Sequence, residues 1–445
     1  MSVSVFVVHI VFNSGAVREH EHESAPVRSQ GARLEESVEL CTAVGFRVLL
    51  VQSVQLSRPH PATLIGLGKV EEIARSVMAQ AVDVVFVDVT LSPLQQRNLE
   101  RLWKARVLDR TGLILKIFAQ RARSKEGQLQ VELARLNYQS SRLVRSWTHL
   151  ERQRGGFGFI GGPGETQIEA DRRLIRKRIV RIKRALVKVR TRRELQRRNR
   201  NRLSCHVVAL VGYTNVGKSA LFNRLTSAEV ETRDLLFATL DPTMRRFAHG
   251  HGHTVILSDT VGFISDLPTE LIAAFRATLE EVVEASLILH VRDISHCETE
   301  AQAGDVRNVL AMLGVDEARR DDIVEVWNKI DCLTAEDRKA VAARAARQAG
   351  EVALTSARTG EGLDDLSGLI KRMLSRKAQC FRITFGPAEG RHLAWLYEVG
   401  DVVERHDGED GMVEVSVRIP PEKVGPLKNR FASSPYRLDE MSPTS

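Results

Sequence analysis

The chain has 445 residues, of which 43% are hydrophobic and 27% charged, and a formal net charge of +9. The length exceeds what one hydrophobic core organises, so we expect two to four globular domains. Five scattered cysteines form no Cys-x-x-Cys pair, which argues against a disulfide framework or zinc site and for reduced thiols in a cytoplasmic protein. No apolar run reaches the roughly 18–20 residues of a membrane span, so we expect no stable membrane insertion.

Residues 1–120 predict an N-terminal α/β subdomain. Apolar runs typical of buried strands occupy residues 1–12, 46–52 and 83–88. The first of these has no basic leader or cleavage site, so it indicates a strand rather than a signal peptide. Residues 68–80 have helical spacing, and Ser92-Pro93 predicts the start of a further helix, with a serine cap and proline in the first turn.

Residues 121–204 predict a long antiparallel helical hairpin. Each arm carries a heptad seam of mostly apolar residues at 4-3-4-3 spacing. The seams consist of Leu129, Leu133, Leu136, Ser140, Leu143, Trp147 and Leu150 on the first arm and of Ile175, Ile179, Ile182, Leu186 and Val189 on the second. Between the arms, residues 155–164 hold six glycines in ten positions, a density that predicts a non-helical tip.

The second arm is strongly basic. From Arg172 to Arg202 it carries sixteen Lys and Arg and a single acid, Glu194, so the rest of the chain is net negative. Such local basicity indicates a surface for a polyanion, on which Arg and Lys would neutralise RNA phosphates. The alternative is an ordinary solvated helix face, but the lack of balancing acids argues against it.

Residues 205–377 alternate strand and helix in the rhythm of a parallel, doubly wound sheet. Residues 378–445 predict a small α+β domain with a loose tail after Arg437.

The first chemical motif is a complete G-x-x-x-x-G-K-S at residues 212–219. It follows an apolar strand and precedes a helix, which is the context of a phosphate-binding P-loop rather than of a chance glycine turn. Its backbone N–H groups would converge on a β-phosphate. Lys218 would bridge the β- and γ-phosphates, and the Ser219 hydroxyl would bind Mg²⁺. The remaining members are Gly212, Tyr213, Thr214, Asn215, Val216 and Gly217.

The second motif is Asp-Thr-Val-Gly, formed by Asp259, Thr260, Val261 and Gly262 after a predicted strand. Asp259 would reach Mg²⁺ through water, and the Gly262 N–H would meet the γ-phosphate. Between the two motifs we expect a mobile segment that offers Thr239 to Mg²⁺, with Thr243 as the competing candidate. That segment comprises Phe237, Ala238, Thr239, Leu240 and Asp241.

The third motif, Asn328, Lys329, Ile330 and Asp331, specifies the base. The Asp331 carboxylate can accept from the N1–H and N2–H₂ of guanine, whereas adenine offers no such pair of donors. Asn328 would read N7 or tie loops together, and the loop of Ser356, Ala357 and Arg358 would donate a backbone N–H to guanine O6. The nucleotide is therefore predicted to be GTP.

Phe263 follows the second motif, where many signalling GTPases place a glutamine that orients the attacking water. Phenylalanine cannot orient water, so we expect slow hydrolysis unless a partner completes the site. A phenylalanine that merely packs beneath the segment is compatible with this.

With these motifs the chain resembles the HflX family of bacterial ribosome-associated GTPases. The resemblance rests on residues 92–100, 117–136, 147–153, 161–179, 212–219, 237–243 and 259–268, and extends from about residue 45 to 377, more weakly to about 430. It implies the four domains described above, binding to the large ribosomal subunit and its rRNA, and a role in ribosome splitting, rescue or assembly. The tip departs from the family, since Ile160 and Gly161 stand where an arginine often precedes Gly-Pro-Gly.

We therefore predict a multi-domain α/β protein that hydrolyses GTP with Mg²⁺, with Lys218, Thr239 and Gly262 as catalytic residues and Ser219 and Thr239 as metal ligands. We expect a monomer that binds no DNA. An RNA-modifying enzyme with a regulatory GTPase domain is one alternative, with Cys380, His20, His22 and His392 as its candidate residues. A regulatory switch for a protein or membrane partner is the other.

Overall fold

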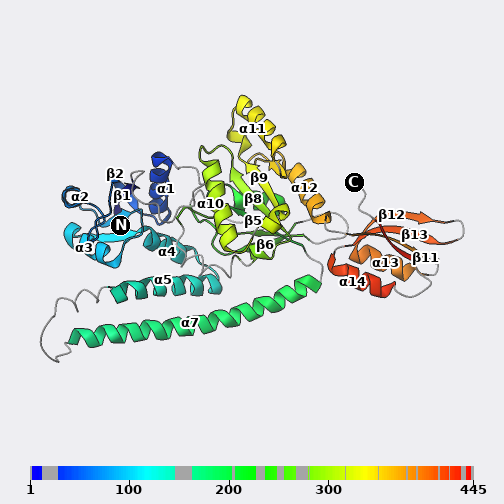
Figure 1. Cartoon of the computed structure of the whole chain (residues 1–445), viewed down its shortest axis with the longest axis horizontal. Helices are drawn as coiled ribbons and strands as arrows, with labels where there is room; N and C mark the ends of the chain where they lie inside the picture. The colour runs from blue at the N-terminus through cyan, green and yellow to red at the C-terminus, as the bar shows by residue number, and fades with distance from the viewer. Residues whose placement is uncertain are drawn as a thin grey trace.

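In the part of the chain that it describes, the computed structural model contains three β-sheets, arranged from the N-terminal unit to the C-terminal unit (Figure 1). It confirms the predicted fold class, while the domain boundaries remain a prediction. The residues that the structure describes are 3–12, 29–145, 163–202, 206–226, 236–247, 255–266, 279, 281–315, 317–348, 350–376, 379–386, 389–408, 411–419, 421–431 and 437–441.

The N-terminal unit is a four-stranded parallel sheet in the order β2-β1-β3-β4. Its strands are β1 (Ser4–Phe12), β2 (Arg47–Leu56), β3 (Val84–Val87) and β4 (Arg106–Asp109), and its helices are α1 (Gln30–Ala43), α2 (Leu67–Ala79), α3 (Pro93–Trp103) and α4 (Arg110–Arg121). The apolar start of the chain is an interior strand, as predicted. Ser92 and Gln95 form a reciprocal capping box at the start of α3, which confirms the predicted cap.

Two helices, α5 (Lys125–Arg145) and α7 (Pro163–Arg202), lie side by side in Figure 1, below the N-terminal unit and the six-stranded sheet described next. The predicted seam of α7 holds, since Ile182 is buried and the other four seam residues are half-buried. The most buried apolar residues of α5 include Val131 and Ala134, which lie off the predicted seam and join the main core. Helix α5 therefore packs on two faces, whereas a single heptad repeat describes only one apolar face of a helix.

The tip of the hairpin needs one correction. Pro163 and Gly164, predicted to be non-helical, are the first residues of α7, because proline suits the first helical turn, where its missing N–H costs nothing. Trp147, Leu150 and residues 155–162 lie outside the described residues.

The third unit is a six-stranded sheet in the order β10-β9-β8-β5-β7-β6, parallel except for β6. The strands are β5 (His206–Gly212), β6 (Thr243–Phe247), β7 (Val255–Asp259), β8 (Leu287–Asp293), β9 (Ile323–Asn328) and β10 (Val352–Leu354). The helices are α8 (Lys218–Thr226), α10 (Thr299–Met312), α11 (Ala335–Arg347) and α12 (Leu363–Ser375), with short 3₁₀ turns at Glu317–Asp322 and Ile330–Cys332.

The C-terminal unit is an antiparallel sheet in the order β12-β13-β11-β14. It contains β11 (Gln379–Phe385), β12 (Asp401–Asp407), β13 (Val413–Ile419), β14 (Arg437–Met441), α13 (Gly390–Val399) and α14 (Pro421–Arg430). The prediction of a loose tail after Arg437 is wrong as far as Met441, because β14 pairs with β11 as an edge strand, while residues 442–445 lie outside the described residues.

One hydrophobic core joins the N-terminal sheet, α4, α5 and the six-stranded sheet. Phe86 of β3, Val131 of α5 and Leu210 of β5 all belong to it. Units far apart in sequence are thus held together by buried apolar contact. Among the described residues, no helix combines the length and apolarity needed to span a bilayer.

Candidate functional site

The P-loop lies between the end of β5 and the start of α8, as its strand–loop–helix context predicts. Its first and last glycines have positive φ, +156° at Gly212 and +93° at Gly217. A Cβ on Gly217 would lie 2.4 Å from Asn328 Nδ2, so only glycine fits where the two loops meet. Asn215 also adopts a left-handed conformation, with φ +60°.

Lys218 is buried, and its ammonium turns back onto the loop. Its Nζ donates to the carbonyls of Tyr213 at 2.6 Å and Gly212 at 3.2 Å. Burial lowers the pKa of Lys218 from 10.5 to about 8, although the nearby Asp259 acts in the opposite direction. The protein thus holds a cation in a place where water does not stabilise it.

Three oxygen-bearing side chains converge beside Lys218. Ser219 Oγ donates to Asp259 Oδ2 at 2.6 Å and lies 2.9 Å from Thr239 Oγ1, which in turn lies 3.2 Å from Asp259 Oδ2. Thr243, the competing candidate, lies instead in β6, paired with Asp259 in the backbone ladder. Burial raises the pKa of Asp259 above its usual value, while hydrogen bonds from Ser219 and the charge of Lys218 act against this.

Gly262 lies against the P-loop at a distance that excludes a side chain. A Cβ there would be 2.9 Å from Thr214 Cγ2 and 3.0 Å from Lys218 Nζ. The next residue, Phe263, has a buried ring. Its backbone pairs with the P-loop: the Phe263 N–H donates to the Gly212 carbonyl at 3.1 Å, and the Phe263 carbonyl accepts from the Thr214 N–H at 2.8 Å. The ring is therefore a packing group and contributes no polar atom to the site.

The base-reading candidates meet at the other end of the P-loop. Asn328 Nδ2 donates to the Val216 carbonyl at 2.8 Å, and its Oδ1 accepts from the Ala357 N–H at 2.9 Å. Of the two roles left open for Asn328, the structure shows the tie between loops. The Asp331 carboxylate accepts from Ser356 Oγ at 2.6 Å, which lowers the pKa of Asp331.

The other predicted residues support these loops. Lys329 has a left-handed backbone and pairs with Asp293 at 2.6 Å, and Ile330 is buried. The Arg358 carbonyl accepts from Arg224 at 2.6 Å. Thr260 Oγ1 donates to the Leu210 carbonyl at 2.6 Å, and Val261 belongs to the core.

A polar network that the sequence did not predict connects the site to the N-terminal unit. The Tyr213 hydroxyl bonds Glu36 of α1 and accepts from the Ser265 N–H at 2.8 Å. Arg110 of α4 pairs with Glu36 and donates to the Ser265 carbonyl at 3.0 Å. These residues stand up to 229 positions apart, so no local pattern could have revealed the network.

The residues around Thr239 also face the N-terminal unit. The Phe237 ring packs edge-on against Phe118 of α4, with ring centroids 4.8 Å apart. Asp241, predicted to contact the nucleotide, directs its carboxylate to the backbone N–H groups of Arg123 and Ser124, at 2.8 and 2.6 Å. Leu240 is buried in the core and Ala238 is half-buried.

The residues of the RNA-modifying alternative lie elsewhere. Cys380 is in β11 and His392 in α13, where His392 pairs with Glu389 at 2.5 Å and packs against Phe431. His20 and His22 lie outside the described residues.

Comparison with known proteins identifies the relatives of this chain. Family models match residues 31–119 (GTP-binding GTPase N-terminal), 121–200 (GTP-binding GTPase middle region), 207–329 (50S ribosome-binding GTPase) and 340–440 (HflX C-terminal domain). The GTPase HflX of Magnetococcus marinus is 49% identical over 89% of this chain and 90% of its own length. That of Escherichia coli is 45% identical over 87% and 89%.

Among solved structures, the complex of SsGBP with GDP covers 84% of this chain and 99% of its own, at 22% identity and a TM-score of 0.46. The family matches, on a fold that carries a P-loop, define a P-loop GTPase, an enzyme that hydrolyses GTP. Within that class, the chain belongs to the HflX family of GTPases.

Proposed function

We propose that this GTPase hydrolyses GTP with Mg²⁺ at the site around Lys218 and acts on the large ribosomal subunit. The convergence of Lys218, Ser219, Thr239 and Asp259 carries the catalytic part of the proposal. Lys218 would contact the β- and γ-phosphates, the Gly262 N–H the γ-phosphate, and Asp331 the guanine edge. The P-loop, the Thr239 segment and the loop at Ser356 would complete the nucleotide contacts.

The oxygen ligands fit Mg²⁺. Ser219 and Thr239 contribute hydroxyls, and Asp259 Oδ1 is buried with no hydrogen-bond partner among the residues that the structure describes. A buried carboxylate oxygen without a partner is costly unless a cation or water satisfies it. When bound, Mg²⁺ would neutralise charge on the phosphate oxygens, while Ser219 and Thr239 would hold it and Asp259 would act through water.

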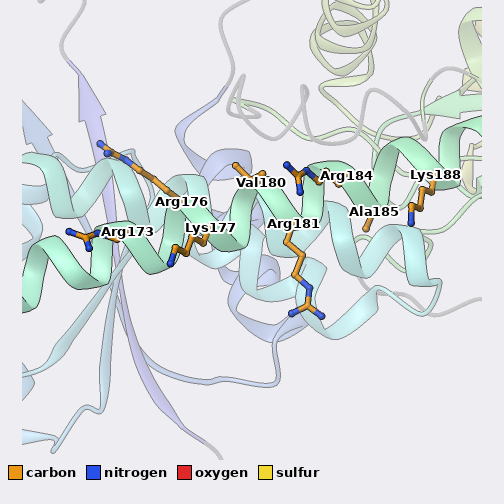
Figure 2. A pocket seen from close by; sticks show the side chains of 8 residues that line it. All are labelled: Arg173, Arg176, Lys177, Val180, Arg181, Arg184, Ala185 and Lys188. Carbon is orange, nitrogen blue, oxygen red and sulfur yellow. The ribbon is translucent and has the colours of Figure 1, made fainter.

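The partner is supported by the outer face of α7. Along α7, six basic side chains together with Val180 and Ala185 line a pocket of about 630 Å³ (Figure 2). These basic residues are Arg173, Arg176, Lys177, Arg181, Arg184 and Lys188. A row of cations along a helix matches the regular charge of an RNA backbone, and rRNA is the polyanion of the large subunit. The matched family model described as a 50S ribosome-binding GTPase supports the same partner.

Co-sedimentation with purified large subunits over a range of salt concentrations tests the partner. Binding that weakens linearly with log salt supports an rRNA contact, since phosphate neutralisation releases counterions. No binding at any salt concentration would favour the regulatory switch without a ribosome. We further propose that the protein acts as a cytoplasmic monomer in splitting, rescue or assembly of ribosomes.

A further inference from the structure

The segment that carries Thr239 is fixed from outside the nucleotide site. We define the switch I segment as residues 236–243. Two residues before Thr239, the Phe237 ring packs on Phe118 near the end of α4. Two residues after it, the Asp241 carboxylate binds the start of α5. Both contacts fall on the junction where α4 leads into the hairpin.

The Asp241 carboxylate accepts three hydrogen bonds from residues at the start of α5. Its Oδ2 accepts from the N–H groups of Arg123 and Ser124, and its Oδ1 accepts from the Ser124 hydroxyl. Ser124 Oγ also accepts from the Gly127 N–H at 2.9 Å, so it caps α5 at the same time. A carboxylate at a helix N-terminus gains from the free N–H groups and from the helix dipole.

The backbone of switch I is held in an unfavourable conformation. Phe237 has φ +55°, a left-handed value that is rare for a residue with a bulky side chain. Such a conformation persists only where surrounding contacts enforce it. The contacts that hold this segment include the buried Phe237 ring and the Asp241 carboxylate, which flank Thr239, together with the buried side chains of Leu236 and Leu240.

We infer that Asp241 is a positioning residue for GTP hydrolysis, through which the base of the hairpin holds Thr239 beside Ser219. The inference rests on the proposed metal role of Thr239. In the clamped arrangement Thr239 Oγ1 lies 2.9 Å from Ser219 Oγ, where both hydroxyls can face one cation. A movement of α5 would reach Thr239 through Asp241 and Leu240. Binding of a partner to the hairpin would therefore change the geometry of the proposed metal site.

Gly127 allows the clamp to be tested from the hairpin side, with Asp241 left intact. A Cβ on Gly127 would lie 2.4 Å from Asp241 Oδ1 and 3.1 Å from Ser124 Oγ, so Gly127→Ala must displace the carboxylate. Alanine favours the helix over glycine, but the same Cβ would also crowd Ser124 Oγ, which caps α5, so GDP affinity is measured alongside activity as a check for wider damage. Gly304→Ala in α10 is the matched control, because a Cβ there meets nothing within 4 Å.

The experiment measures GTP hydrolysis by the full chain without ribosomes, at several Mg²⁺ concentrations, together with GDP affinity. The variants are Asp241→Asn, Gly127→Ala, Gly304→Ala and Thr239→Ala. Asp241→Asn and Gly127→Ala should lower kcat roughly tenfold, because one charge-assisted hydrogen bond is worth about that factor. They should raise the Mg²⁺ concentration for half-maximal activity and leave GDP affinity within about twofold of the parent chain. Gly304→Ala should behave as the parent chain.

Three outcomes would overturn the inference in different ways. If Thr239→Ala raises the Mg²⁺ requirement while Asp241→Asn and Gly127→Ala do not, the clamp is merely structural and the metal site stands. If Thr239→Ala leaves the Mg²⁺ requirement unchanged, the proposed metal role fails and the inference with it. A parallel loss of GDP affinity in Gly127→Ala would indicate general damage and would also reject positioning.

Discussion

At the scale of single residues, the buried ammonium of Lys218 links nucleotide binding to pH. Its pKa is lowered to about 8 by burial, whereas the phosphates of a bound nucleotide would stabilise the charged form. The unfolded chain keeps the usual value of 10.5, so it binds more protons than the folded chain between about pH 8 and 10.5. The nucleotide-free protein should therefore gain stability as pH rises through this window.

GTP binding should consequently take up protons. At pH 8 Lys218 is neutral in about half of the nucleotide-free molecules, so GTP binding should take up about half a proton for each nucleotide bound. The affinity for GTP should fall as the pH rises further. Calorimetry at pH 8.5 in two buffers of different ionisation enthalpy measures this uptake. Lys218→Arg keeps its charge at this pH and serves as the control, in which the uptake should vanish. Equal binding enthalpies in both buffers for the parent chain would contradict the prediction.

Asp331 should determine the choice of base. The Ser356 hydroxyl holds its carboxylate and lowers its pKa, so an ionised acceptor faces the proposed guanine position at neutral pH. Asp331→Asn should weaken GTP binding about 10- to 100-fold and improve binding of xanthosine nucleotides, which replace the amino donor with a carbonyl. Competition binding with GTP, ATP and XTP measures the change. The control Asp337→Asn, at the exposed start of α11, should leave the preference for GTP unchanged. An Asp331→Asn variant that also keeps this preference would refute the role of Asp331 in reading the base.

These residues could be located from sequence because each motif is local. Residues 212–219 supply their own turn, glycines and helix start, so eight consecutive letters define the loop. Asp241 shows the opposite case. Its place beside Thr239 in the sequence suggested a nucleotide contact, but its hydrogen-bond partners Arg123 and Ser124 stand 118 and 117 positions away in the chain. Tyr213 likewise belongs to the motif, while its hydroxyl serves the contact with Glu36.

At the scale of secondary structure, periodicity predicted α7 better than α5. Helix α7 has one packed face, and its heptad seam is the side that is least exposed. Helix α5 is packed against α7 and also contributes Val131 and Ala134 to the main core. The strand β14 could not be predicted because an edge strand depends on its neighbour, here β11, for its hydrogen bonds.

The exposed face of α7 should account for the salt dependence of ribosome binding. Replacing Arg173, Arg176 and Lys177 by glutamine should weaken binding to the large subunit and reduce the slope of log affinity against log salt by about three units at most. Co-sedimentation at several salt concentrations measures the slope. A control of equal charge replaces Lys339, Arg347 and Lys371 on α11 and α12, and should alter the slope less. Equal slopes for both triple variants would place the RNA contact outside this face.

At the scale of the whole molecule, the GTPase site is built from several units of the chain. The six-stranded sheet supplies the phosphate and base loops, α1 and α4 hold Tyr213 and Ser265, and the base of α5 holds Asp241. The groups that would bind nucleotide are therefore preorganised. No glutamine follows Gly262, however, and the buried Phe263 ring can neither donate to nor accept from water.

We therefore predict slow turnover in isolation and strong stimulation by large ribosomal subunits. Positioning of the attacking water is what the site lacks. In other GTPases, a partner that completes the active site raises the rate about 10³- to 10⁵-fold, in those cases with an arginine that stabilises the transition-state charge. The GTP form would hold the subunit, and hydrolysis would release it. Steady-state hydrolysis with and without purified large subunits tests this, and small subunits serve as the control RNA–protein particle.

Phe263→Leu is a better probe than Phe263→Ala, because truncating a fully buried ring to alanine costs about 3–5 kcal/mol and would disturb the P-loop pairing. The leucine variant should keep the stimulation, since the ring supplies packing and no catalytic atom. A fast rate in isolation that added subunits do not change would refute the mechanism and favour a self-contained regulatory switch.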